Sequence, residues 1–193
     1  VSISAVGIYS AAVNVVSIPN TLLNSIENSW SPWFLHNISV SNYKSIEDKN
    51  NKIISLFFIF IIIFMLVSPD LIKIMLNKEY WEALYVLLPL SMAVFTELIY
   101  LIPLNLELYY KKSNMLWLYT SLSVVFNIVL DILCIKYFGY LAGAYVTCAS
   151  RFFLFVLHYL RAKHIDANDV VNIKLVLLYL AALFFVNILC LVD

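Results

Sequence analysis

Residues 53–76 read IISLFFIFIIIFMLVSPDLIKIML, and this stretch decides the fold class. Its apolar run has the length of about 20 residues that an α-helix needs to cross a bilayer core roughly 30 Å thick. Five other stretches meet the same requirement. The six spans are predicted near residues 5–35, 53–76, 83–109, 114–136, 140–161 and 172–192. We therefore expect an all-α, polytopic membrane helix bundle that forms a single transmembrane domain over residues 1–193.

The composition also favours a bundle surrounded by lipid. Hydrophobic residues make up 63% of the chain and charged residues 12%, against about 45–50% and about 25% in soluble domains. The formal net charge of zero gives no reason to expect a nucleic-acid partner, so membrane lipids are the expected surroundings. Because the chain begins at Val1 within a helical pattern, we expect it to be part of a longer protein.

Basic residues are divided unevenly between the connections of the predicted spans. Eight of them accompany the first, third and fifth connections: Lys44, Lys49, Lys52, Lys111, Lys112, Arg161, Lys163 and Lys174. Three accompany the second and fourth: Lys73, Lys78 and Lys136. Cytoplasmic connections carry the excess of Lys and Arg in membrane proteins. The first span is therefore predicted to run from the outside to the inside of the cytoplasmic membrane.

A polar stripe follows the first predicted span. Its members recur at steps of three and four residues: Ser10, Asn14, Ser17, Thr21, Asn24, Asn28 and Ser31. This spacing places them on one face of a helix, and such a row does not face lipid. Two interpretations stay open. The stripe packs against another helix through small polar groups, or Asn14, Asn24 and Asn28 line a water-filled cavity.

Charged residues inside the spans form the second set of candidates. Arg151 lies near the middle of the fifth span, Glu97 of the third, Asp131 in the fourth with Asn127, and Glu27 beside the polar stripe. A charge at the bilayer centre costs roughly 2.5–3.5 kcal/mol on insertion scales, so each needs compensation. Either they form structural pairs, such as Arg151 with Asp131 or Glu97, or they line a polar lumen in which the cation binds anionic cargo.

The sequence contains no familiar catalytic motif. HExxH, GxSxG and the phosphate-binding P-loop pattern do not occur, and the chain has three glycines. The residues therefore give no reason to expect an enzyme, a cofactor or a metal site. His158, toward the end of the fifth span, is predicted to be an interfacial residue.

Four stretches resemble a known family in order and spacing. They are Val6–Ala12 (VGIYSAA), Ser29–Phe34 (SWSPWF), the block from Ser68–Pro69 to Leu88–Pro89–Leu90, and the block from Asn127 through Gly139 to Thr147. Together they resemble the C-terminal half of the O-antigen (Wzx-type) polysaccharide flippase family, in the multidrug/oligosaccharidyl-lipid/polysaccharide exporter superfamily. Tyr145 and Arg151 depart from the pattern, since the family more often has a small residue and an uncharged residue at these positions.

The resemblance implies a MATE-like transporter of about 12–14 spans, with about seven of them in an N-terminal half that precedes this chain. It implies a flippase in the bacterial inner membrane that moves isoprenoid-pyrophosphate-linked oligosaccharide units outward. These units supply surface polysaccharide such as O-antigen, lipopolysaccharide or capsule, and H⁺ or Na⁺ is the expected coupling ion.

Within that function, Arg151 would pair with the pyrophosphate. Amides of the polar stripe would bind sugar hydroxyls. The lumen would also contain these residues: Glu27, Glu97, Asn127 and Asp131.

Two alternatives to the flippase stay open. A multidrug or cation antiporter of the same fold would use the acidic residues Glu27, Glu97 and Asp131. A membrane polysaccharide polymerase or glycosyltransferase would need a large outer loop to hold catalytic groups, whereas the predicted outer connections have only a few residues.

Overall fold

A computed structural model describes residues 3–166, 168 and 170–192. The described residues form six α-helices and two short 3₁₀ helices, η1 and η2. The α-helices are α1 (Ile3–Ser39), α2 (Tyr43–Met75), α3 (Ala83–Tyr109), α4 (Leu116–Phe138), α5 (Ala142–Ile165) and α6 (Ile173–Val192). The 3₁₀ helices are η1 (Lys78–Tyr80) and η2 (Ser113–Met115). All six α-helices are long and apolar enough to cross a membrane, so the prediction of a six-helix, all-α bundle is confirmed.

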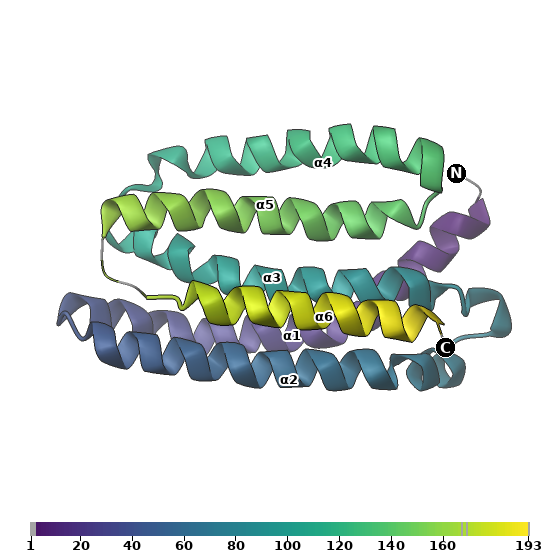
Figure 1. Cartoon of the computed structure of the whole chain (residues 1–193), viewed down its shortest axis with the longest axis horizontal. Coiled ribbons are helices and arrows are strands. Elements are labelled where there is room, and N and C mark those ends of the chain that lie inside the picture. The colour runs from purple at the N-terminus through teal and green to yellow at the C-terminus, as the bar shows by residue number, and fades with distance from the viewer. Residues whose placement is uncertain (1–2, 167, 169, 193) are drawn as a thin grey trace.

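Successive helices alternate in direction along the long axis of the bundle (Figure 1). The α1–α2, α3–α4 and α5–α6 connections meet at one end, and the α2–α3 and α4–α5 connections meet at the other. These two groups are the connections predicted to be cytoplasmic and external, respectively. As a consequence α3 and α5 run parallel to each other and pack closely.

The start of α2 differs from the sequence prediction. The predicted spans 5–35 and 53–76 leave residues 36–52 between them, but the chain turns only at residues 40–42 and α2 begins at Tyr43. Hydropathy detects the apolar part of a helix and misses a polar extension. Here Ile46 and Asn50 are fully buried, and Asn50 accepts a hydrogen bond from Trp30 Nε1 and donates one to the carbonyl of Val170. The extension is therefore stabilised by packing and hydrogen bonds.

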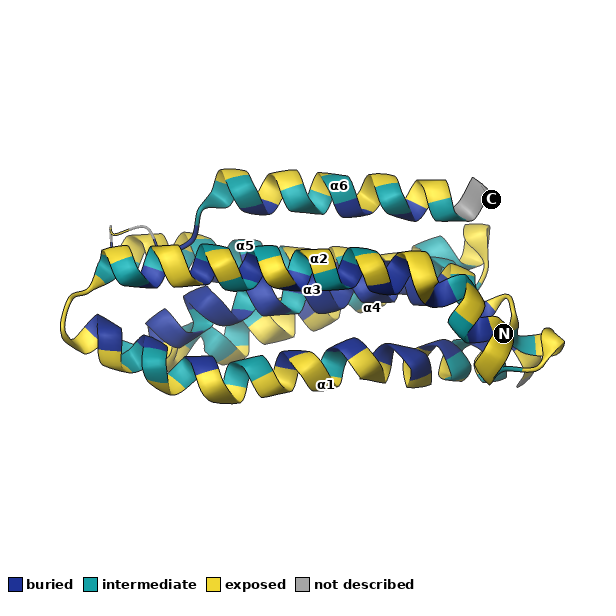
Figure 2. Ribbon diagram, turned by 90° about the horizontal axis from the view of Figure 1, so that it is seen from below, coloured by how far each residue is buried: buried dark blue, intermediate teal, exposed yellow. Residues whose placement is uncertain are grey.

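Helix α3 is the centre of the bundle. It packs against α1, α2, α5 and α6 and is buried along most of its length, whereas α1 exposes residues along its outer side (Figure 2). A helix that is hydrophobic on all sides is expected to be surrounded by other helices. The partly exposed exceptions on α3 include Glu97 and Tyr100, which places these two side chains at the edge of the core.

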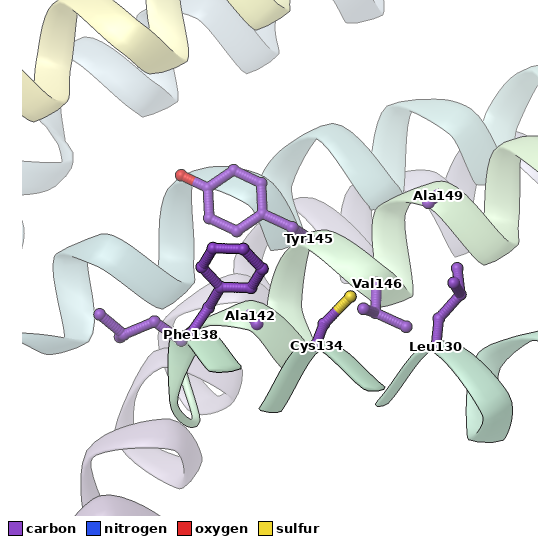
Figure 3. Close-up of a pocket in the computed structure, with 8 residues that line it drawn as sticks. Leu130, Cys134, Phe138, Ala142, Tyr145, Val146 and Ala149 are labelled. Carbon is purple, nitrogen blue, oxygen red and sulfur yellow. The ribbon is translucent and has the colours of Figure 1, made fainter. Parts of the chain in front are cut away.

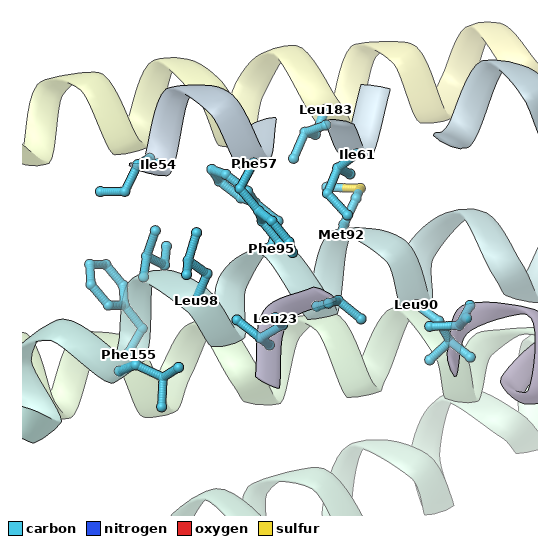
Figure 4. Packing of buried hydrophobic residues seen from close by; sticks show 14 of the residues in the cluster. Leu23, Ile54, Phe57, Ile61, Leu90, Met92, Phe95, Leu98, Phe155 and Leu183 are labelled. Carbon is cyan, nitrogen blue, oxygen red and sulfur yellow. The ribbon is translucent and has the colours of Figure 1, made fainter. Parts of the chain in front are cut away.

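An aromatic group joins α2, α3 and α6 on the opposite side of the core. The rings of Phe57 and Phe95 stack with centroids 6.5 Å apart, and Phe58 stacks on Tyr179 at 4.0 Å. Figure 4 shows Phe57 and Phe95 between the helices, close to Leu98 and Leu23. Such aromatic pairs contribute about 0.5–1.5 kcal/mol beyond the burial of their area. They hold α6, which has few other neighbours, onto the bundle.

The outer helices present apolar side chains to their surroundings. Helix α4 packs chiefly on α5, and Ser123 is its one buried residue. Its exposed positions include Val125, Val129, Ile132 and Leu133. Contact of such an apolar surface with water is unfavourable, whereas contact with lipid hydrocarbon is favourable. Together with their lengths, this identifies the six helices as candidate transmembrane segments and indicates a multi-pass membrane protein.

Candidate functional site

Arg151 and Glu97 form an ion pair between α5 and α3. Arg151 Nη1 lies 2.9 Å from Glu97 Oε1, and the two side chains are 41% and 30% exposed. Of the two partners considered for Arg151, the structure therefore places Glu97 against it. Asp131 forms no ion pair among the described residues.

The ion pair borders a polar recess of about 500 Å³ between α3, α4 and α5. The recess is lined by Glu97, Tyr100, Thr120, Ser123, Val124, Asn127, Thr147, Ser150, Arg151 and Leu154. A smaller recess of about 120 Å³ adjoins it on the side of α1 and shares three lining residues, Glu97, Thr147 and Arg151. The ion pair thus stands between two hollows, in the middle part of helices that are candidate membrane spans.

Hydroxyl and amide groups in the wall of the polar recess donate hydrogen bonds to groups of α5. Ser123 Oγ donates to the carbonyl of Ser150 at 3.0 Å, and Asn127 Nδ2 donates to Ser150 Oγ at 3.1 Å. Thr147 donates to the carbonyl of Gly143. The two bonds to Ser150 hold α4 on α5, and the Thr147 bond lies within α5. Arg151 and Glu97 are the charged residues among those that line the recess.

The structure brings Arg151, Glu97 and Asn127 into one recess but leaves Asp131 and Glu27 outside it. Asp131 Oδ1 is buried and has no hydrogen-bond partner among the described residues; it lies beside Gly143 of α5. Glu27 borders a much smaller hollow between α1, α2 and α3. These two carboxylates therefore do not meet Arg151.

The polar stripe lies along one face of α1, as its spacing predicts: its members from Ser10 to Asn28 are exposed, whereas Ser31 is half-buried and donates a hydrogen bond to Asn105 Oδ1 of α3 at 2.6 Å. Asn14, Asn24 and Asn28 are exposed, and the described residues provide no hydrogen bond to their side-chain amides. The stripe hydroxyls of Ser17 and Thr21 instead donate to carbonyls of their own helix. The three asparagines consequently do not pack against another helix of this chain.

None of the polar stripe lines either recess. Its sequence neighbours Val13 and Asn20 line the smaller one, so the stripe runs beside the hollow that contains Arg151. A separate recess of about 520 Å³ between α4 and α5 contains no candidate residue. It is lined mainly by apolar side chains, including Leu130, Phe138 and Val146 (Figure 3).

The prediction for His158 is wrong. His158 is fully buried, and its Nδ1 lies 2.7 Å from Oε1 of the equally buried Glu107. The imidazole meets the rings of Tyr100 and Tyr119 edge-on, with centroids 5.0 and 5.2 Å away. A residue near the end of a span reaches the membrane interface only if no neighbouring helix packs over its side chain. Here α3 and α4 pack over His158.

The spacing of Arg151 and His158 was the signal that could have revealed this pair. They are seven residues apart and so lie on one face of α5, while Glu97 and Glu107 lie on α3. Two acidic residues on α3 thus match a cation and a histidine on the helix that packs against it. The buried pair of His158 and Glu107 also lies close to the polar recess, because Tyr100 both lines the recess and contacts His158.

A third polar cluster closes the end of the bundle that is predicted to be cytoplasmic. Tyr43 and Tyr110 each donate a hydrogen bond to Asp166 Oδ2, at 2.8 and 2.7 Å. Burial raises the pKa of Asp166, but hydrogen bonds from Asn168, Tyr110 and Tyr43 outweigh it and hold the pKa below its ordinary value. The cluster ties the segment after α5 to the ends of α2 and α3.

Comparison with protein-family models, curated proteins and solved structures gives no match for this chain. The fold and the site therefore define its class: a bundle of six candidate transmembrane helices with an ion pair in a polar recess at mid-span.

Proposed function

We propose that this chain belongs to a flippase that moves isoprenoid-pyrophosphate-linked oligosaccharides across the cytoplasmic membrane for surface polysaccharide biosynthesis. The observation that carries the proposal is Arg151. Its guanidinium is partly exposed to the polar recess at the middle of a candidate span, 2.9 Å from Glu97. A charge at that depth is costly unless it is paired or functional.

The chemistry of the recess supports an anionic and hydroxylated cargo. An arginine binds phosphate groups through two parallel N–H donors, which gives both strength and orientation. Tyr100, Thr120 and Asn127 in the recess wall carry groups that can exchange hydrogen bonds with sugar hydroxyls. The exposed amides of the polar stripe extend such groups along α1.

Sequence resemblance supplies the remaining support, and it motivates the lipid-linked substrate and the longer parent protein. In such a protein the polar stripe and the two recesses would face the other half of the transporter. Alternating access would then rock one half against the other around the recess.

A cation antiporter of the same fold is the second candidate function. One observation favours it: Asp131 Oδ1 is buried without a hydrogen-bond partner among the described residues, as a cation-binding carboxylate would be. A polymerase or glycosyltransferase has less support, because the connections at the end predicted to be external span only residues 76–82 and 139–141.

The test measures export of lipid-linked oligosaccharide beside membrane abundance for the whole protein in its host. Arg151→Gln should accumulate and export less than about a tenth as much as the wild type. Arg151→Lys, which keeps the charge but loses the two-pronged donor geometry, should also export poorly. Arg161→Gln removes the other arginine of α5, outside both recesses, and is the matched control. Full export by a stable Arg151→Gln protein would contradict the proposal.

A further inference from the structure

The contact between Arg151 and Glu97 is incomplete as an arginine–carboxylate pair. One nitrogen, Nη1, meets one oxygen, Oε1, whereas the strongest pairs use two parallel hydrogen bonds. Both side chains are also about one-third exposed to the recess. The described residues therefore leave much of the guanidinium available to a ligand.

Arg151 is the one cationic residue among those that line the recess, so no second cation there can neutralise Glu97 when an anion binds Arg151. Its other polar lining residues are neutral: Tyr100, Thr120, Ser123, Asn127, Thr147 and Ser150. An anion that reaches Arg151 must therefore compete with the Glu97 carboxylate for the same guanidinium. It also comes close to a like charge, which opposes binding.

We propose that Glu97 is an exchangeable counter-ion: the phosphate group of the cargo displaces it from Arg151, and it returns to Arg151 when the cargo leaves. This inference rests on the proposed function and gives Glu97 a role that lowers affinity for the cargo. The exchange keeps Arg151 compensated in the empty protein, where a lone mid-membrane charge would be costly. It also prevents the cargo from binding too tightly to be released.

Removing the competitor should tighten anion binding. A partly exposed ion pair alters an equilibrium by a modest factor, and relief of repulsion adds to it, so we expect about a five- to tenfold fall in Kd. The probe is inorganic pyrophosphate, titrated into the purified whole protein in detergent by calorimetry. Glu97→Gln and Glu97→Ala should both bind it more tightly than the wild type does.

Three further variants separate this inference from the proposed function. Arg151→Gln should lose pyrophosphate binding, and Arg151→Gln with Glu97→Gln should not regain it. Glu79→Gln removes an exposed negative charge from η1, outside both recesses, and should leave Kd unchanged. It therefore controls for a general effect of charge.

The outcomes distinguish two failures. If Arg151→Gln binds pyrophosphate as the wild type does, or if neither the wild type nor the Glu97 variants bind it, both the proposed function and the counter-ion role are wrong. If Arg151→Gln loses binding but the neutral Glu97 variants bind no more tightly than the wild type, the counter-ion role alone is overturned.

Stability gives a second readout in case the Glu97 variants fold poorly. An uncompensated Arg151 should lower their thermal stability, and pyrophosphate should restore it more strongly than it stabilises the wild type. Instability that pyrophosphate does not relieve would identify Glu97 as a purely structural partner and overturn the inference.

Discussion

Glu107 and His158 form the most deeply buried ionisable pair that the structure describes, and replacing one of them should expose its energetic role. Both side chains are 0% exposed, with 2.7 Å between Oε1 and Nδ1. The second atoms of each group, Oε2 and Nε2, already lack partners among the described residues. His158→Phe keeps an aromatic ring for Tyr100 and Tyr119 to contact, but it leaves the carboxyl group of Glu107 with no hydrogen bond.

Removing one member of a buried pair costs about 3–5 kcal/mol, because the other is left uncompensated. For a chain of this length each kcal/mol corresponds to about 2–4 °C in the unfolding temperature. We therefore expect His158→Phe to lower the Tm by roughly 10 °C. Combining it with Glu107→Leu removes both polar groups and should recover most of that loss, since an apolar replacement of a whole pair is often neutral.

The assay is thermal unfolding of the purified protein in detergent, arranged as a double-mutant cycle. His164→Phe is the matched control, because His164 is an exposed histidine on the same helix and its replacement should shift the Tm little. If His158→Phe alone costs less than about 1 kcal/mol, or if the double variant is as unstable as the sum of the single ones, the reasoning about a coupled buried pair is refuted.

Three other predictions follow from the remaining features of the bundle. A cysteine at Ser45 should react with an impermeant thiol reagent only from the cytoplasmic side and one at Lys78 only from outside; the reverse pattern would invert the orientation. A cysteine at Asn24 should label with a small hydrophilic reagent and one at the buried Leu23 should not; equal protection of both would contradict a water-facing stripe. Hydrogen bonds lower the pKa of Asp166 below 3.8, so its stabilising contribution is complete above that pH and is lost as the pH falls through the lowered value. Protease cleavage after α5 should therefore rise in acid, whereas the Asp166→Asn variant should show no such acid-induced rise.

The helices were predictable because each is encoded by local sequence. Apolar length determines where a span lies, and the steps of three and four residues determine which face of α1 carries Asn14, Asn24 and Asn28. Hydropathy failed at the start of α2, where Asn50 is buried by specific hydrogen bonds to Trp30 and Val170. The spacing of apolar residues in the sequence does not predict such hydrogen bonds.

The arrangement of the candidate site depended on how the helices pack. The sequence left Asp131 and Glu97 as equal partners for Arg151, because the choice depends on the rotation and depth of α4 and α3 relative to α5. In the structure α3 supplies the partner. The burial of His158 depends likewise on coverage by α3 and α4, which the residues of α5 alone do not encode.

Transport in a defined membrane tests the proposed flippase most directly. The whole protein is purified, reconstituted into liposomes that contain a lipid-linked oligosaccharide, and assayed for the fraction of that lipid that becomes accessible to a glycan-modifying enzyme added outside. We predict that accessibility rises well above the half that faces outward in protein-free liposomes, and that Arg151→Gln protein leaves it near the protein-free level. If wild-type protein leaves the accessible fraction at the protein-free level, or if the Arg151→Gln protein raises it equally, the proposed role of the polar recess is contradicted.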